Sequence, residues 1–254
     1  MARPLWPHNR TIFLPPHHLY LFPLISGSVW FLTITILLLR WLSLGRPRYP
    51  GQVNPDIPMI SDIAAQTFQP VFIVGSALTG ISFLGTVFAV HHVRYARDFY
   101  ALTNDKLWRQ GTSLAALGTG VLAAGCLVFL SIFDTYDAHL PHRYLLMGTF
   151  GGLFMSALLT SLVWWDQTRG PVVFVGLRKW CIFNVALVIA QFVVGVLFVS
   201  LMYSGYYHAA GILEWSLTYL GAVWLLSFVG YTRFREGEKP WLEDVEGERR
   251  PLLE

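Results

Sequence analysis

Charged residues are scarce in this sequence. Asp, Glu, Lys and Arg make up 13% of its 254 residues, about half the share found in a typical soluble domain. The mean hydropathy is +0.50, and 54% of the residues are hydrophobic. This composition argues against a soluble protein and predicts one that is embedded in a membrane.

Cysteine and net charge are also low. The two cysteines, Cys126 and Cys181, both fall inside apolar runs, which excludes a disulfide framework and leaves the redox compartment open. The formal net charge is only +3, and the basic residues lie between the apolar runs rather than along one face. The sequence therefore gives no indication of nucleic-acid binding.

The sequence is rich in long runs of residues without charge. A helix needs about 20 residues to cross the hydrocarbon core, and a crossing segment must satisfy its backbone hydrogen bonds internally. We therefore predict an all-α, polytopic membrane protein: a six-helix bundle over residues 20–232, with an arm at 1–19 and a tail at 233–254. The six uncharged runs are Tyr20–Leu39, Ile63–Val90, Gly111–Phe133, Tyr144–Trp165, Trp180–Tyr207 and Trp215–Thr232.

Orientation follows from the positions of Lys and Arg. Of the 18 basic residues, only Arg40, Arg46, Arg48 and Arg143 fall beside the first, third and fifth connections. Basic residues concentrate on the cytosolic side, so we expect both termini in the cytosol and these three connections in the lumen or outside the cell. Residues 45–69, which contain four prolines, are expected to form an irregular loop that caps the bundle on the non-cytosolic side.

Ionisable side chains gather in these non-cytosolic connections, most densely in residues 131–144. We take them as a polar cluster that binds lipid headgroups or carries chemistry, and no catalytic residue is assigned. The cluster comprises Ser61, Asp62, Asp134, Asp137, His139, His142, His208, Glu214 and Trp215.

Glu214 and the histidines each allow two interpretations. Glu214 is expected at the start of the sixth helix, where it either interacts with the helix dipole or faces the bundle interior as a functional acid. His139, His142 and His208 could form a three-histidine zinc site with Asp134 or Asp62 behind it. Pro141 argues against a regular helix there, so we expect loop histidines that bond to carboxylates or lipid phosphates, with no metal and no cofactor.

Polar and small residues inside the spans indicate how the helices pack. Asn184 and Gln191 lie seven residues apart on one helix face and are expected to hydrogen-bond to neighbouring helices. Glycines recur in the second to fourth spans and favour close helix contact, or alternatively a substrate groove. Trp164, Trp165 and Trp180 bracket one connection, which is typical of an interfacial aromatic belt.

The C-terminal tail carries a short pattern of its own. Glu248 precedes the pair Leu252 and Leu253, which resembles an acidic dileucine sorting signal for the lysosome or vacuole. The tail mixes charges without apolar periodicity, so we expect it to be disordered.

Three blocks together resemble the Frag/DRAM/Sfk family of six-span eukaryotic membrane proteins. They are residues 58–62 (PMISD), 134–142 (DTYDAHLPH) and 212–215 (ILEW). The family includes autophagy modulators, a yeast protein tied to phosphoinositide signalling and a factor that remodels GPI-anchor lipids. The resemblance implies that the three blocks meet in space, and it supplies no agreed catalytic residues.

Taken together, the sequence favours a non-enzymatic membrane protein of the plasma membrane, vacuole, lysosome or another endomembrane. It would handle or organise lipids in phosphoinositide signalling, lipid asymmetry or autophagy. Membrane lipids are the expected partners, with cytosolic partners reached through the basic loops and the tail. The alternative is an enzyme, or a subunit of one, in GPI-anchor lipid remodelling that uses the Asp, His and Glu side chains.

Overall fold

The computed structural model describes residues 18–65, 68–95, 106–166 and 175–233. Within these ranges, six helices are long and apolar enough to cross a membrane. The predicted six-span, all-α fold is therefore confirmed. The six are α1 Leu21–Ser43, α3 Gln69–Tyr95, α4 Leu107–Ile132, α5 His139–Val163, α7 Val175–Tyr203 and α8 Tyr207–Ser227, and two short helices are α2 Ile60–Ala64 and α9 Val229–Thr232.

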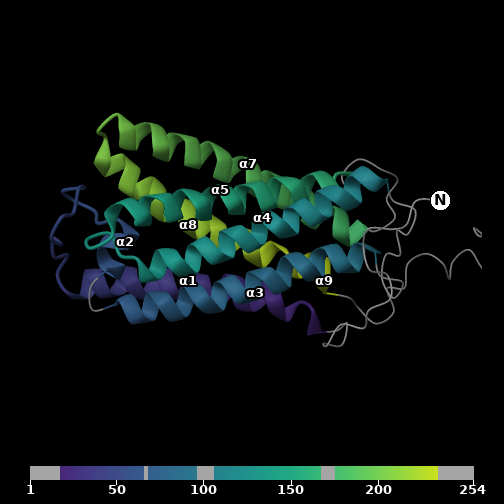
Figure 1. Cartoon of the computed structure of the whole chain (residues 1–254), viewed down its shortest axis with the longest axis horizontal. Coiled ribbons are helices and arrows are strands. Elements are labelled where there is room, and N and C mark those ends of the chain that lie inside the picture. Colours follow the sequence, from purple (N-terminus) through teal and green to yellow (C-terminus); the bar gives the residue numbers. More distant parts are fainter. Residues whose placement is uncertain (1–17, 66–67, 96–105, 167–174, 234–254) are drawn as a thin grey trace, which may run out of the picture.

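The long helices run side by side along the longest axis of the molecule (Figure 1). The first turn of α1 and the last turn of α9 lie at one end of the bundle, here called the α9 end. The loop after α1 and the short helix α2 lie at the opposite end, here called the α2 end. An even number of spans places the two ends of the bundle domain on one side of the membrane.

Two helices begin earlier than the uncharged runs suggest. The sixth span starts at Tyr207 rather than at Trp215, and α5 starts at His139 with Pro141 in its first turn. Proline is tolerated there because the first backbone N–H groups of a helix have no partner within it. The prediction that Pro141 would keep His139 and His142 in a loop is therefore wrong.

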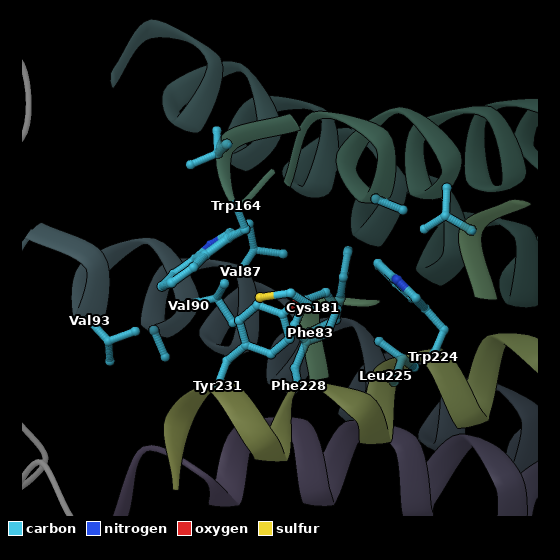
Figure 2. Packing of buried hydrophobic residues seen from close by; sticks show 14 of the residues in the cluster. Phe83, Val87, Val90, Val93, Trp164, Cys181, Trp224, Leu225, Phe228 and Tyr231 are labelled. Carbon is cyan, nitrogen blue, oxygen red and sulfur yellow. The ribbon is translucent and has the colours of Figure 1, made fainter. Parts of the chain in front are cut away.

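The largest buried cluster fills the bundle toward the α9 end (Figure 2). The rings of Trp164 and Tyr231 meet edge to face with centroids 5.3 Å apart, and Trp224 and Phe228 meet similarly at 5.0 Å. Trp164 is only 1% exposed, so its predicted place in an interfacial belt is wrong. Its indole is held inside by the guanidinium of Arg94, whose central carbon lies 5.0 Å from the ring.

Polar contacts between helices confirm the role predicted for the two amides of α7. Asn184 donates to the hydroxyl of Ser227 on α8 at 2.9 Å, and Gln191 donates to the Leu220 carbonyl of α8 at 3.3 Å. The hydroxyl of Ser161 on α5 also lies 3.4 Å from Asn184. Such bonds fix the rotation of α7 against its neighbours in an environment without competing water.

The glycines divide into two groups. Gly75 and Gly152 belong to close helix contacts, because a Cβ at either position would press on Thr33 of α1 or Ala123 of α4. Gly151, in contrast, has no neighbouring atom within 4 Å of a built Cβ, and it lines a cavity. Close packing is therefore confirmed for Gly75 and Gly152, and the substrate groove stays a prediction for Gly151.

Candidate functional site

Loop one, residues 44–59, caps the bundle because α8 holds it by hydrogen bonds. The indole N–H of Trp215 donates to the Pro58 carbonyl at 3.1 Å, and the Ile60 backbone N–H donates to Glu214 Oε2 at 3.2 Å. Asn54 is fully buried and donates to the Tyr207 carbonyl at 2.8 Å. The predicted cap is present, and the short helix α2 forms its inner part.

Residues 133–138, which connect α4 to α5, join the cap from the other side. The ring of Tyr136 lies against Gly51, whose φ of +74° suits glycine, and a Cβ there would meet the ring at 3.1 Å. Burial, reinforced by the nearby Asp62 and Asp134 carboxylates and Tyr49, raises the pKa of Tyr136 to about 12. Tyr136 is therefore a neutral packing group at physiological pH.

A cavity of about 460 Å³ lies under this cap. This volume is within the range of small-molecule binding sites. Its walls are almost wholly apolar and come from α3, α4, α5, α7 and α8, with Trp30 of α1 and α2 at the edge. The polar side chains among the lining residues are Ser61, Thr79, His142, Thr149, Gln191, Ser200, Glu214 and Thr218.

The cavity opens sideways between α5 and α7. Among its lining residues, those that are exposed all belong to these two helices, namely Met147, Gly151, Phe192, Val196, Val199 and Ser200. They come from the parts of α5 and α7 nearest the α2 end, where the two helices separate (Figure 1). Toward the α9 end the gap closes at Phe154 and Phe192, whose rings stack with centroids 5.3 Å apart.

Three of the predicted site residues come together at this cavity, since Ser61, His142 and Glu214 all line it. Glu214 is 5% exposed and is the eighth residue of α8. It therefore does not lie in the first turn of the helix, where one interpretation placed it. Its side chain faces the bundle interior, as the other interpretation required. Trp215, beside it, anchors loop one through Pro58.

The remaining predicted residues have local roles. Asp134 accepts from the backbone N–H groups of Tyr136 and Asp137 at 2.8 and 2.7 Å and so shapes the turn before α5. Asp137 and His139 are exposed. The three-histidine arrangement does not form: His208 pairs with Asp56 at 3.0 Å, whereas the Nδ1 atom of His142 lies 2.7 Å from the Phe133 carbonyl. In the described parts of the chain, no three His, Cys, Asp or Glu side chains are placed to share a metal.

Asp62 stabilises the short helix that roofs the cavity. Its Oδ2 atom accepts from the Met59 backbone N–H at 2.9 Å, one of the donors that the start of α2 leaves free. Burial raises the pKa of the Asp62 carboxyl, and the hydrogen bond from Met59 lowers it in part. Asp62 does not line the cavity, so we assign it a structural role.

The stretch that forms the bundle and its cap matches a known protein family. The model of the Frag1/DRAM/Sfk1/Cwh43P N-terminal domain matches residues 18–230. The chain belongs to this family. The resemblance inferred from the three blocks is thereby confirmed, and the blocks at 58–62 and 212–215 do meet in space through Pro58 and Trp215.

A curated member of the family, protein sfk1 of Schizosaccharomyces pombe, is 27% identical over 205 residues. The match covers 81% of this chain and 61% of the relative's own length. No solved structure matches this Frag1/DRAM/Sfk1 chain.

Sequence reasoning missed two parts of the site in this family member. The first is the apolar cavity itself, which arises because α5 and α7 separate. The second is Asn54, whose side chain binds three backbone groups: the Tyr207 carbonyl, and the N–H groups of Asp56 and Ile57 at 3.0 and 3.2 Å. The four nearby prolines predicted an irregular loop, but only the structure places Asn54 against α8.

Replacing Asn54 by alanine is expected to loosen the cap. The change leaves three backbone groups without their partner, at a cost of about 1–3 kcal/mol. Amide hydrogen exchange over residues 50–60 should become faster, while exchange in α4 stays unchanged.

Asp56→Ala is the control for Asn54→Ala. Asp56 is two residues away, but its side chain is 62% exposed and pairs only with the exposed His208. Surface pairs of this kind contribute about 1 kcal/mol or less. Equal exchange rates in the two variants would show that Asn54 does not hold the cap.

Proposed function

We propose that this protein is a non-enzymatic lipid-binding protein of the membrane. A lipid tail enters the cavity sideways from the bilayer between α5 and α7, and its head stays under the loop-one cap. The observation that carries the proposal is the shape of the cavity: mostly apolar walls, a lateral opening bordered largely by exposed apolar side chains, and Ser61 and Glu214 under the cap.

The position of α7 supports this proposal. Only 17% of its membrane-crossing stretch is buried inside the protein, against 50% for α8. A helix that packs mainly on one neighbour can move outward at little cost and widen the opening. Figure 1 places α7 on the outside of the bundle, next to α5 and α8.

The arrangement of the polar groups favours binding over catalysis. In the part of the chain that the structure describes, Ser61, His142 and Glu214 share the cavity, but none of these three side chains hydrogen-bonds to another. A nucleophile needs its base within hydrogen-bond reach, so the arrangement gives the alternative of GPI-anchor lipid remodelling no support beyond the family resemblance.

Filling the opening tests the proposal. The double variant Gly151→Leu and Gly195→Leu places two leucines in the gap between α5 and α7, and a Cβ meets no atom within 4 Å at either position. Both glycines are helical, so the change does not weaken the helices. We expect lipid binding by the purified protein, measured by native mass spectrometry, to fall at least about tenfold, a loss of about 1.4 kcal/mol.

The matched control is Gly118→Leu with Gly125→Leu. These glycines lie on α4, a Cβ there also meets nothing within 4 Å, and neither lines the cavity. The control is expected to bind lipid like the unmodified protein. If both double variants bind equally well, the cavity is not the binding site and the proposal fails.

We also propose that the α2 end faces the lumen or the cell exterior, with both termini in the cytosol. The concentration of Lys and Arg at the α9 end supports this orientation. Cytosolic partners reached through the basic loops and the tail remain part of the proposal. The sorting residues Glu248, Leu252 and Leu253 lie outside the described residues, as do most of the arm and the tail, so the compartment stays a prediction.

A further inference from the structure

We infer that the cavity selects lipids whose head donates hydrogen bonds, through a hydroxyl, amide or ammonium group, over lipids with an anionic head. The selecting group is the carboxyl of Glu214. This inference rests on the proposed function, because it concerns which lipid the same cavity accepts.

Glu214 presents an acceptor to the cavity. One carboxyl oxygen, Oε2, accepts from the Ile60 backbone N–H at 3.2 Å. The other oxygen has no hydrogen-bond partner among the described residues, although the residue is only 5% exposed and lines the cavity. A buried carboxyl with an unused oxygen is costly unless something supplies a donor, so the position points to a ligand that does.

The surroundings of Glu214 disfavour an anionic head. Among the residues that the structure describes, no lysine or arginine lines the cavity. The ionisable side chain that acts on Glu214 is Asp62, which is also an acid. A phosphate or carboxylate placed here would lose its water with no cation to compensate, whereas a hydroxyl, amide or ammonium group can donate to the open oxygen of Glu214.

The two buried donors of the cavity that lack a partner in the described chain do not change this selection. The Thr79 hydroxyl and the Trp224 indole N–H have no hydrogen-bond partner within the described ranges. They lie deeper, however: Trp224 is ten residues beyond Glu214 along α8, about 15 Å at 1.5 Å per residue. An anionic head at that depth would sit among hydrocarbon groups, so these donors contact the tail region and not the head.

A set of amphiphiles with one tail and different heads tests the inference. The purified protein is titrated with hexadecanol, hexadecylamine, N-hexadecylacetamide, palmitate and hexadecyl phosphate, and native mass spectrometry gives each Kd. A donor head satisfies the open carboxyl oxygen, whereas an anionic head is desolvated without a cation, so we expect the three donor heads to bind at least about tenfold tighter than the two anionic heads. The Kd values of the three donor amphiphiles also show whether a hydroxyl, an ammonium or an amide head is preferred.

Glu214→Gln should remove the selection. The Gln side chain keeps an acceptor for the Ile60 N–H but supplies donors of its own in place of the acid, so the donor and anionic heads should then bind within about threefold of each other. Asp56→Asn, which removes an exposed carboxylate at the same end, should leave the selection unchanged. If Glu214→Gln does not fold, the ranking of the five amphiphiles on the unmodified protein still decides.

Anionic heads binding as tightly as donor heads to the unmodified protein would overturn the inference, as would an unchanged ranking in Glu214→Gln. These failures differ from a failure of the proposed function. If all five amphiphiles bind equally and Gly151→Leu with Gly195→Leu prevents their binding, the cavity holds lipid without selecting the head. If that double variant has no effect on any of them, the proposed function itself is wrong.

Discussion

Asp166→Ala is expected to lower the free energy of unfolding by about 3 kcal/mol, one of the largest effects of any single substitution in this protein. Asp166 holds a fully buried guanidinium at the α9 end: Arg94 donates to both of its carboxylate oxygens, at 3.2 and 2.9 Å. Arg109 donates to the same carboxylate at 3.2 Å. Removing the carboxylate leaves two cations close together, one of them inside the bundle. The loss lies at the lower end of the range for buried pairs because Asp166 is 24% exposed.

The thermal unfolding midpoint in detergent measures this effect, with Asp137→Ala as control. Asp137 is an exposed acid at the other end of the bundle, and its removal should change stability by about 0.5 kcal/mol or less. Arg94→Met combined with Asp166→Ala should recover much of the loss, because the buried charge and its partner then disappear together. Equal midpoints for Asp166→Ala and Asp137→Ala would mean that the pair contributes nothing.

This ion pair changes which basic side chains are accessible to partners. The basic loops were expected to meet cytosolic partners, and Arg94 and Arg109 flank one of these loops. Arg94 is instead buried, with its guanidinium between Asp166 and the ring of Trp164. Its position four residues after the end of the uncharged run Ile63–Val90 gave no sign of this, because its partner comes from a different connection, 72 residues away.

The fold was predictable because the bilayer imposes it. Each span must be long, uncharged and helical, so counting uncharged runs gives the number and order of the helices. The ends of the helices were less predictable, since a helix continues beyond the hydrocarbon for as long as its backbone bonds allow. Gly205, with φ of +79°, makes the turn after α7, and the predicted start of the sixth span took no account of this glycine as a sign that α8 begins soon afterwards.

The site was predictable only in part. Its polar members could be found because ionisable residues are rare in this chain, and Ser61, His142 and Glu214 do share a cavity. Their contacts could not be found, since Glu214 binds a backbone group 154 residues away that has no sequence signature. The zinc hypothesis likewise depended on spacing along the chain, whereas the fold gives His208 a separate partner in Asp56.

Trp224→Ala is expected to cost about 3–5 kcal/mol and at the same time to extend the cavity. Trp224 is 2% exposed and belongs both to the buried cluster of Figure 2 and to the cavity wall. Its ring packs on Phe83 and Phe228, with centroids 5.8 and 5.0 Å away. Replacing it by alanine removes the floor of the cavity, so a longer lipid tail can fill the space that the indole occupied.

Ligand rescue distinguishes this loss from ordinary core damage. A saturating long-chain amphiphile such as octadecanol should raise the unfolding midpoint of Trp224→Ala more than that of the unmodified protein, because a ligand that binds only the folded state stabilises it. Trp164→Ala is the matched control: Trp164 is 1% exposed and in the same cluster, but it does not line the cavity. The control should be destabilised and should gain no extra stability from the amphiphile. If Trp224→Ala gains no more than the unmodified protein, the tail of the lipid does not reach Trp224; if Trp164→Ala gains as much as Trp224→Ala, the gain is not specific to the cavity.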